Sequence, residues 1–113
     1  MNFNFLSPVS DSVLAHSELL SQQTIGKKLK IHSEKYGLPD LDGVQLAIIG
    51  IKENRNDVNY IGSELNYNDL RKTLYSLFAG NWHTIIADLG DIEPGESTED
   101  SYYALRTSVE LLV

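Results

Sequence analysis

Two long apolar runs constrain the fold of this chain more than any other feature of its sequence. The first covers residues 44–51 and the second residues 84–92, and both are rich in β-branched side chains. Short apolar runs of this composition predict strands, and a strand that is apolar on both faces is typical of a parallel sheet packed between helices. We therefore expect two buried strands.

Helical patterns follow both runs. After the first, Asn68 is a favourable N-cap, Gly80 is placed to end the helix in a left-handed conformation, and four apolar residues share one face: Leu70, Leu74, Leu77 and Phe78. After the second, Ser97 and Asp100 resemble a capping box. One face of the helix that follows is then marked by Tyr102, Leu105, Val109 and Leu112.

The order strand, helix, strand, helix over residues 44–113 predicts an α/β fold, a three-layer α/β/α arrangement with a mainly parallel sheet. Residues 1–43 are expected to hold a helix over 10–21 and an extended or loop segment, in which residues 24–32 fit either a strand or a loop. The last helical pattern reaches Val113 without a stop signal, so we expect a single α/β domain that is truncated at residue 113.

Composition excludes several classes of partner. Nine basic against sixteen acidic side chains give a net charge of −7, which repels nucleic acid and anionic membranes, and no cysteine is present to form a disulfide or a thiolate metal site. The longest apolar run is far shorter than the roughly 20 residues that span a bilayer, and the first residues do not resemble a secretory signal. We expect a cytoplasmic protein without nucleic-acid or membrane partners.

Two aspartates form the first candidate site. Asp88 and Asp91 lie at the carboxyl end of the second strand, where open α/β sheets place their ligands, and His83 precedes them. These three residues are weak candidates for metal ligands, because two carboxylates alone do not fill a six-coordinate shell. The alternative is that both aspartates brace the turn at Gly90.

The asparagine-rich loop over residues 52–67 forms the second candidate site. Asn54, Arg55 and Asn56 follow the carboxyl end of the first strand, and a guanidinium there is suited to hold a carboxylate. Asparagine also tolerates left-handed turns, so these residues are candidates either for ligand binding or for loop structure alone.

Three segments together resemble the N-terminal third of the ureohydrolase family, which includes arginase, agmatinase and formimidoylglutamase. The first strand ends Ile-Ile-Gly-Ile at residue 51, the helix over 70–77 reads Leu-Arg-Lys-Thr-Leu-Tyr-Ser-Leu, and the second strand ends Asp-Leu-Gly-Asp-Ile at residue 92. The resemblance covers residues 44–113 and is strongest to the formimidoylglutamase-like branch. One departure is that residues 66–69, Asn-Tyr-Asn-Asp, stand where the family usually has a Gly-Pro step.

The resemblance implies a parent protein that hydrolyses a guanidino or formimino C–N bond with hydroxide activated by two metal ions. The manganese ligands of the family come from later motifs, Gly-Gly-x-His, Asp-x-His-x-Asp and Asp-x-Asp, and the resemblance implies that all of them lie beyond residue 113. Manganese and a small-molecule substrate are therefore implied only for the full-length parent. This chain is expected to hold no cofactor and no catalytic residue.

Three hypotheses for function follow. The first is an N-terminal portion of a ureohydrolase-like protein, non-catalytic on its own, which contributes fold and subunit contacts and self-associates through an exposed strand edge. The second is a stand-alone binding module that holds a small anionic or peptide ligand with the loop over residues 52–67. The third is a small metal-dependent enzyme that uses Asp88, Asp91 and His83.

Overall fold

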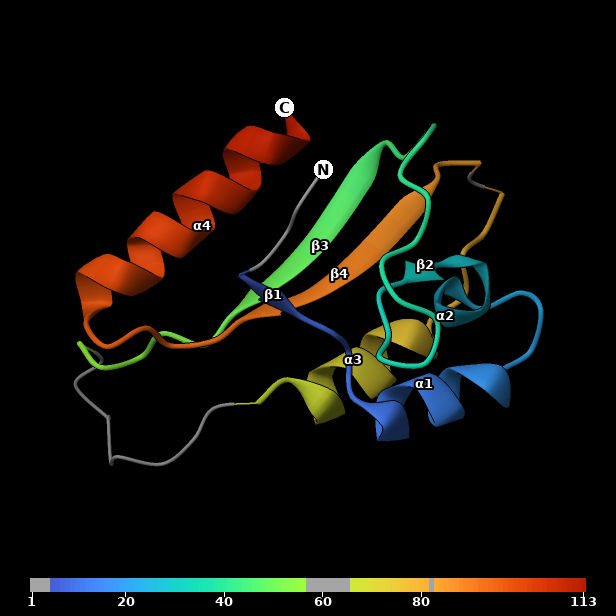
Figure 1. The fold of residues 1–113 in the computed structure, drawn as a ribbon. Helices are drawn as coiled ribbons and strands as arrows, with labels where there is room; N and C mark the ends of the chain where they lie inside the picture. Colours follow the sequence, from blue (N-terminus) through green and yellow to red (C-terminus); the bar gives the residue numbers. More distant parts are fainter. Residues whose placement is uncertain (1–4, 57–65, 82) are drawn as a thin grey trace.

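The computed structural model describes residues 5–56, 66–81 and 83–113, and it has a mixed α/β fold (Figure 1). Over these residues the elements are, in chain order, β1 (Leu6–Ser7), α1 (Asp11–Glu18), α2 (Ile25–Lys28), β2 (Lys30–Ile31), β3 (Leu46–Ile51), α3 (Asn68–Tyr75), β4 (Ile86–Ile92) and α4 (Thr98–Leu112). The order β3, α3, β4, α4 is the one predicted for residues 44–113.

The sheet is built around β4. β3 runs parallel to β4 along one side, with Ile48 opposite Asp88, and β2 runs parallel to the amino half of β4 on the other side. β1 pairs antiparallel with the carboxyl end of β4. Two of the three pairings are thus parallel, and β1 makes the sheet mixed, because the chain crosses the end of β4 at Ser7, whose hydroxyl donates to the carbonyl of Asp91 (3.1 Å).

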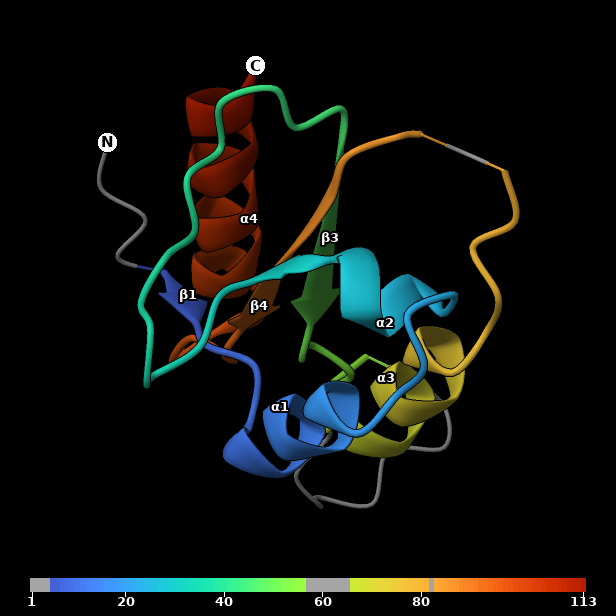
Figure 2. The same cartoon turned by 90° about the vertical axis from the view of Figure 1, so that its right-hand side faces the viewer.

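Helices lie on both faces of the sheet. Figure 2 shows α4 on one face and α1, α2 and α3 on the other. On the α4 side a core of buried residues contains Leu6, Ala87, Leu89, Ile92 and Ala104. On the opposite side a second core contains Val9, Val13 and Tyr75. The backbone of β4 therefore separates two small cores, and its buried side chains confirm the predicted burial of the second strand.

The N-terminal segment has more regular structure than the sequence indicated. Ser10 caps α1, and its hydroxyl accepts from the amide of Val13 (3.4 Å), but the helix ends at Glu18 rather than at residue 21. Within residues 24–32 the chain makes one helical turn, α2, before β2 begins at Lys30. The strand alternative is therefore correct for two residues. The described residues contain no helix that is both long and apolar enough to cross a membrane.

Helix α3 buries a different face from the one predicted. Its buried side chains are Arg71 and Tyr75, while Leu70 is 63% exposed. The helix also ends at Tyr75, so Leu77 lies beyond it, and Gly80 has φ +66° in the following loop instead of terminating the helix. The physical reason is polar: Arg71 and Tyr75 turn toward the sheet to meet the carboxylate of Asp88.

Helix α4 begins as predicted, but its most deeply buried residues are not those of the predicted apolar face. The hydroxyl of Ser97 accepts from the amide of Asp100 (3.2 Å), which confirms the capping signal. The side chains that are buried are small, namely Ser101, Ala104 and Ser108, while Val109 is 43% exposed. Leu105 and Leu112 of the predicted stripe are partly buried against the same core, so the small residues add to the predicted contact instead of replacing it.

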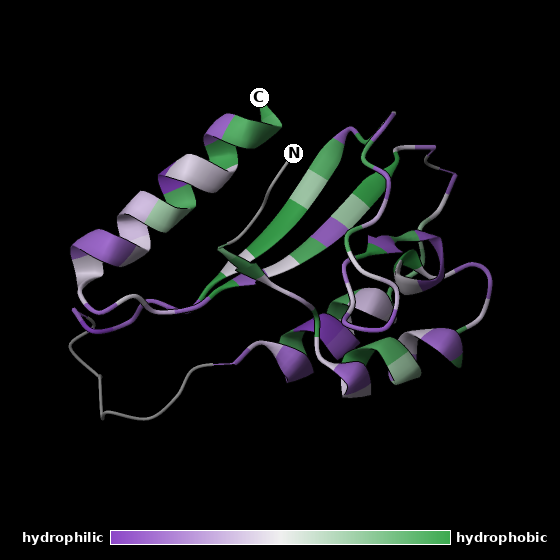
Figure 3. Ribbon diagram, in the orientation of Figure 1, coloured by the Kyte–Doolittle hydropathy of each residue, from purple (hydrophilic) through white to green (hydrophobic). Residues whose placement is uncertain are grey.

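Strand β3 lies at the edge of the sheet and is only half covered. Among the described residues it pairs with β4 alone, and Leu46 is 53% exposed. Figure 3 shows that β3 is hydrophobic along most of its length although it occupies this outer position. The prediction that the first apolar run is buried on both faces is therefore wrong for β3, since no second neighbouring strand is described.

Gly90 provides a direct test of the β1–β4 contact. Its φ is +93°, and a Cβ at this position would lie 1.9 Å from the carbonyl oxygen of Ser7. We expect Gly90→Ala to lower the free energy of unfolding by about 2–4 kcal/mol, from backbone strain plus steric overlap. Gly37→Ala is the matched control, because Gly37 has φ +76° with open space around it and should cost only about 1 kcal/mol. Urea denaturation at a fixed protein concentration measures both, and equal losses would contradict the close contact.

Candidate functional site

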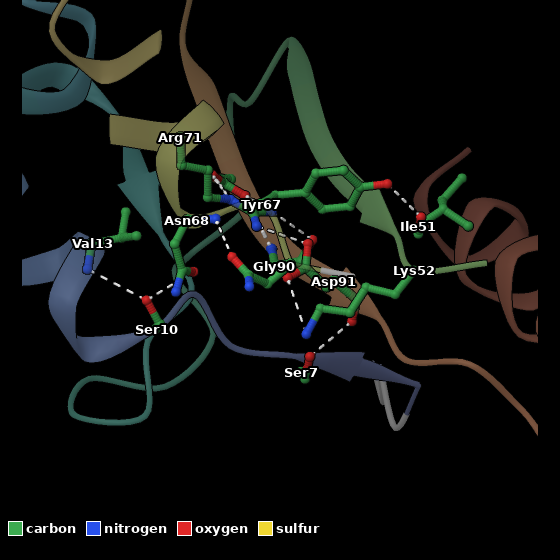
Figure 4. A network of polar contacts seen from close by, with 12 residues as sticks. Ser7, Ser10, Val13, Ile51, Lys52, Tyr67, Asn68, Arg71, Gly90 and Asp91 are labelled. Atoms are coloured by element: carbon green, nitrogen blue, oxygen red, sulfur yellow. Dashed lines mark hydrogen bonds and ion pairs between the residues drawn. The ribbon is translucent and has the colours of Figure 1, made fainter. Parts of the chain in front are cut away.

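The carboxyl half of β4 holds a buried ionic cluster, seen from close by in Figure 4. The guanidinium of Arg71, on α3, donates to both carboxylate oxygens of Asp88 (Nε to Oδ2 2.8 Å, Nη2 to Oδ1 3.1 Å). It also donates to Asp91 (Nη1 to Oδ1 2.7 Å) and to the carbonyl of Gly90 (3.0 Å). One cation therefore pairs with two carboxylates and joins α3 to the sheet.

Because the cluster is buried, its charges have a large effect on the stability of the fold. Asp88 has no exposed surface and Arg71 is 4% exposed, so neither charge is stabilised by bulk water. Asp88 also accepts from the hydroxyl of Tyr75 and from the amide of Gly90 (3.1 Å). Burial, and then the charge of Asp88, raise the pKa of the Tyr75 phenol, so Tyr75 remains a neutral donor. Each polar atom of the cluster has a partner, which is the condition under which a buried network is stable.

Gly50 allows Asp91 to reach across the neighbouring strand. The two residues are opposite each other in the β3–β4 pair, where the register shifts between Ile48 and Gly50. A Cβ on Gly50 would lie 1.9 Å from Oδ1 of Asp91, the oxygen that Arg71 contacts. The absence of a side chain at Gly50 therefore makes room for the ion pair.

A second polar cluster joins the loop after β3 to α4. The carboxylate of Glu53 accepts from Arg55 (Nε to Oε2 2.9 Å) and from the hydroxyl of Ser101 (2.7 Å). The same hydroxyl accepts from the amide of Gly95 (2.9 Å), in the loop that precedes α4. The hydrogen bonds from Arg55 and then from Ser101 lower the pKa of Glu53 to about 2. Glu53 thus binds three segments together as a carboxylate.

Lys52 extends the first cluster toward Glu93. Its ammonium contacts Glu93 (3.0 Å) and lies 3.9 Å from Oδ2 of Asp91. The hydroxyl of Ser7 also donates to Glu93 (3.0 Å), so β1 contributes to the same edge of the sheet. The lysine and the two arginines described at this edge, Lys52, Arg55 and Arg71, are all paired with carboxylates of the chain itself.

The structure brings Asp88 and Asp91 together but leaves His83 apart from them. His83 is exposed before the amino end of β4, whereas Asp91 is near its carboxyl end. Within the described residues no group of three or more histidine, aspartate or glutamate side chains is arranged to hold a metal. Because the oxygens of Asp88 already accept from Arg71, Tyr75 and Gly90, these residues do not fit a manganese ion, and the geometry agrees with the alternative that the aspartates brace the turn.

The loop candidates are only partly described. Arg55 is bound to Glu53 and also donates to the hydroxyl of Ser101 (3.1 Å), while Asn54 is half-buried and Asn56 is exposed. Residues 57–65 of the same loop lie outside the described residues. Ligand binding by residues 54–56 therefore stays a prediction, and any anion would compete with Glu53 for the guanidinium.

Sequence reasoning missed the residues that hold the site together, above all Arg71, Tyr75 and Glu53. A signal for two of them exists: Arg71 and Tyr75 are four residues apart and so share one helix face. An aspartate inside an otherwise apolar strand such as β4 also requires a buried partner, because acidic residues are almost never fully buried unless paired. No comparable local signal marks Glu53.

Comparison of the chain with protein-family models, with curated proteins and with solved structures finds no match. Functional inference for this chain therefore rests on its own geometry and on the motifs in its sequence.

The buried pair predicts a large effect of removing its cation. Arg71→Leu leaves Asp88 buried without its charged partner, so we expect the free energy of unfolding to fall by about 3–5 kcal/mol. Arg106→Leu is the matched control, because Arg106 pairs with Glu110 on the exposed side of α4 (3.2 Å) and should contribute less than about 1 kcal/mol. Chemical denaturation monitored by circular dichroism distinguishes the two. Similar small losses for both variants would show that the cluster is not buried as described.

The Glu53 cluster predicts a pH-dependent contribution to stability. A carboxylate whose pKa falls from 4.5 to about 2 on folding stabilises the folded state above pH 4.5, and this contribution is lost as the pH falls toward 2. We expect Glu53→Gln to be less stable than the wild type at pH 7, with the difference shrinking below pH 4.5. Thermal unfolding across this pH range measures it. A difference that is unchanged between pH 7 and pH 3 would contradict the role of the carboxylate.

Proposed function

We propose that this chain is an N-terminal portion of a ureohydrolase-like protein, non-catalytic on its own, which contributes sheet strands and subunit contacts. The observation that carries the proposal is the contact between Arg71 and the carboxylates of Asp88 and Asp91. It turns the carboxyl end of β4 into a structural clasp instead of an open ligand site.

The clasp supports the family assignment because it joins two of the segments that carry the resemblance. Arg71 belongs to the helix that reads Leu-Arg-Lys-Thr-Leu, and Asp88 and Asp91 belong to the strand end that reads Asp-Leu-Gly-Asp. When side chains form one buried network, the loss of one leaves the others unpaired. We therefore expect a sequence that has one of these residues to have the others as well. The third segment supplies Gly50, beside which Asp91 lies.

The same contacts support a non-catalytic role for the isolated chain. A catalytic carboxylate has to reach substrate, a metal ion or water, and Asp88 has no exposed surface. The guanidino or formimino hydrolysis implied by the resemblance is therefore proposed only for a longer parent, with manganese held by residues outside this chain. The described chain contributes instead a half-open sheet, with β3 at its edge.

An activity and metal-binding assay tests this proposal. We expect the 113-residue chain, supplied with Mn²⁺, to release no urea, ammonia or formamide from arginine, agmatine or formimidoylglutamate above the protein-free rate. Calorimetric titration with Mn²⁺ should show no stoichiometric binding, because the candidate carboxylates are engaged by Arg71. Asp91→Asn is the informative variant: turnover or metal binding that is present in the wild type and lost in this variant would overturn the proposal.

A further inference from the structure

Two apolar grooves, one on each face of the sheet, border the edge of β3 that has no strand partner among the described residues. On one face the groove runs between β3 and α3 and is lined by residues that include Ile48, Ile51, Tyr67, Leu70 and Leu74. On the other face the groove runs between β3 and the end of α4 and is lined by residues that include Leu46, Ala47, Val109 and Leu112. Within the described residues nothing fills either groove.

The grooves are lined by residues of the helix faces that the sequence predicts to be buried. Leu70 and Leu74 belong to the apolar stripe of α3, and Val109 and Leu112 belong to that of α4. Leu74 and Leu112 pack partly against the two cores, while Leu70 and Val109 stay exposed, because α3 buries its polar pair and α4 buries its small residues. Part of the apolar surface of the described residues thus lies around β3, where it is only partly withdrawn from water.

A strand added to β3 would fill both grooves at once. Successive side chains of a strand point to opposite faces, so alternate residues of an incoming strand would enter the α3 groove and the α4 groove. Such a strand has to be apolar on both faces and uncharged. Among the described strands β3 fits this requirement, whereas β4 carries Asp88 and Asp91 and is already at the centre of the sheet.

We propose that β3 itself is the occupant: β3 of a second copy pairs antiparallel with β3, so that one sheet continues through a two-fold dimer. This inference rests on the proposed function as a sheet-contributing portion and names the partner of its open edge. Residues 46–51 contain no charge and no proline, the features with which exposed edge strands usually prevent pairing.

Charge favours the antiparallel direction. The exposed residues Asp40 and Asp42 precede β3, and Lys52 follows it. Antiparallel pairing places Lys52 of each copy, which also contacts Glu93, beside the acidic turn of the other copy. Parallel pairing would align acidic turn with acidic turn. Because each copy carries a net charge of −7, added salt should strengthen the dimer by screening the repulsion between copies.

Sedimentation analysis of the full chain and two variants tests the proposal. We expect the wild type to reach twice its 12.6 kDa chain mass with rising concentration. Leu46→Lys places a charge in the α4 groove and should raise the dissociation constant about tenfold or more. Leu19→Lys is the matched control, because Leu19 is 88% exposed at the end of α1 and should leave the dimer unchanged. Circular dichroism verifies that both variants fold.

Crosslinking provides the second measurement, which does not depend on a charged variant folding. The chain has no cysteine, so Ala47→Cys, Ile48→Cys and Ile49→Cys each introduce a single thiol. Antiparallel pairing should give disulfide-linked dimers mainly at the positions nearest the two-fold axis, with Leu19→Cys giving none. Equal crosslinking at all three strand positions would indicate parallel pairing and overturn the proposal.

Three further outcomes would contradict the proposed dimer. A wild type that stays monomeric, a Leu46→Lys variant that dimerises like the wild type, or open-ended aggregates in place of a dimer would each overturn pairing through β3. None of these results depends on Mn²⁺ or substrate, so failure of the dimer is distinguishable from failure of the proposed non-catalytic role, which the activity assay measures.

Discussion

The charge of Asp88 is the constraint on which the rest of this structure depends. An aspartate in the central strand of the sheet has no access to water, and the fold has to supply compensating donors. Arg71 and Tyr75 do so from α3, which fixes the rotation of that helix about its axis. The same guanidinium holds Asp91, and the missing side chain at Gly50 lets that carboxylate approach. The position of α3 is thus set by polar contacts and not by its apolar stripe.

The rotation of α3 toward Asp88 explains why apolar side chains lie along the edge of the sheet. A helix that turns its polar pair inward necessarily turns Leu70 and Leu74 toward the free edge of β3. Helix α4 behaves in the same way, because the hydroxyl of Ser101 is drawn to Glu53 and its apolar residues are displaced toward that edge. Two polar clusters therefore place part of the hydrophobic surface of the described residues beside β3.

Much of the architecture could be predicted from the sequence. The predictions that failed concern contacts between residues that are distant in sequence. The apolar runs at β3 and β4, the N-caps of α1 and α4, and the strand–helix alternation are local patterns that the structure confirms. The burial of α3 and α4 was assigned from apolar spacing, which ignores the need of a buried carboxylate for partners. The antiparallel β1 and the edge position of β3 depend on pairings distant in sequence, such as Ser7 with Asp91, which no local pattern contains.

For the candidate site, sequence located Asp88 and Asp91 and offered two roles for them, metal ligands or a brace of the turn. It could not choose between these roles, because the deciding residue, Arg71, lies on a different element 17 positions before Asp88. The geometry favours the brace. Glu53 and Ser101 were outside the reach of sequence reasoning for the same reason, since 48 positions separate them.

The small buried face of α4 has a consequence for how the molecule opens. Serine and alanine side chains withdraw little apolar surface from water, so α4 is held by Ala104, by leucines at 105, 111 and 112 that are only partly buried, and by the hydrogen bonds of Ser101. Helices with few buried apolar contacts are the segments that detach first in local unfolding. Backbone amides of α4 are therefore expected to exchange with solvent faster than those of β4, which makes this helix the movable cover of one groove beside β3.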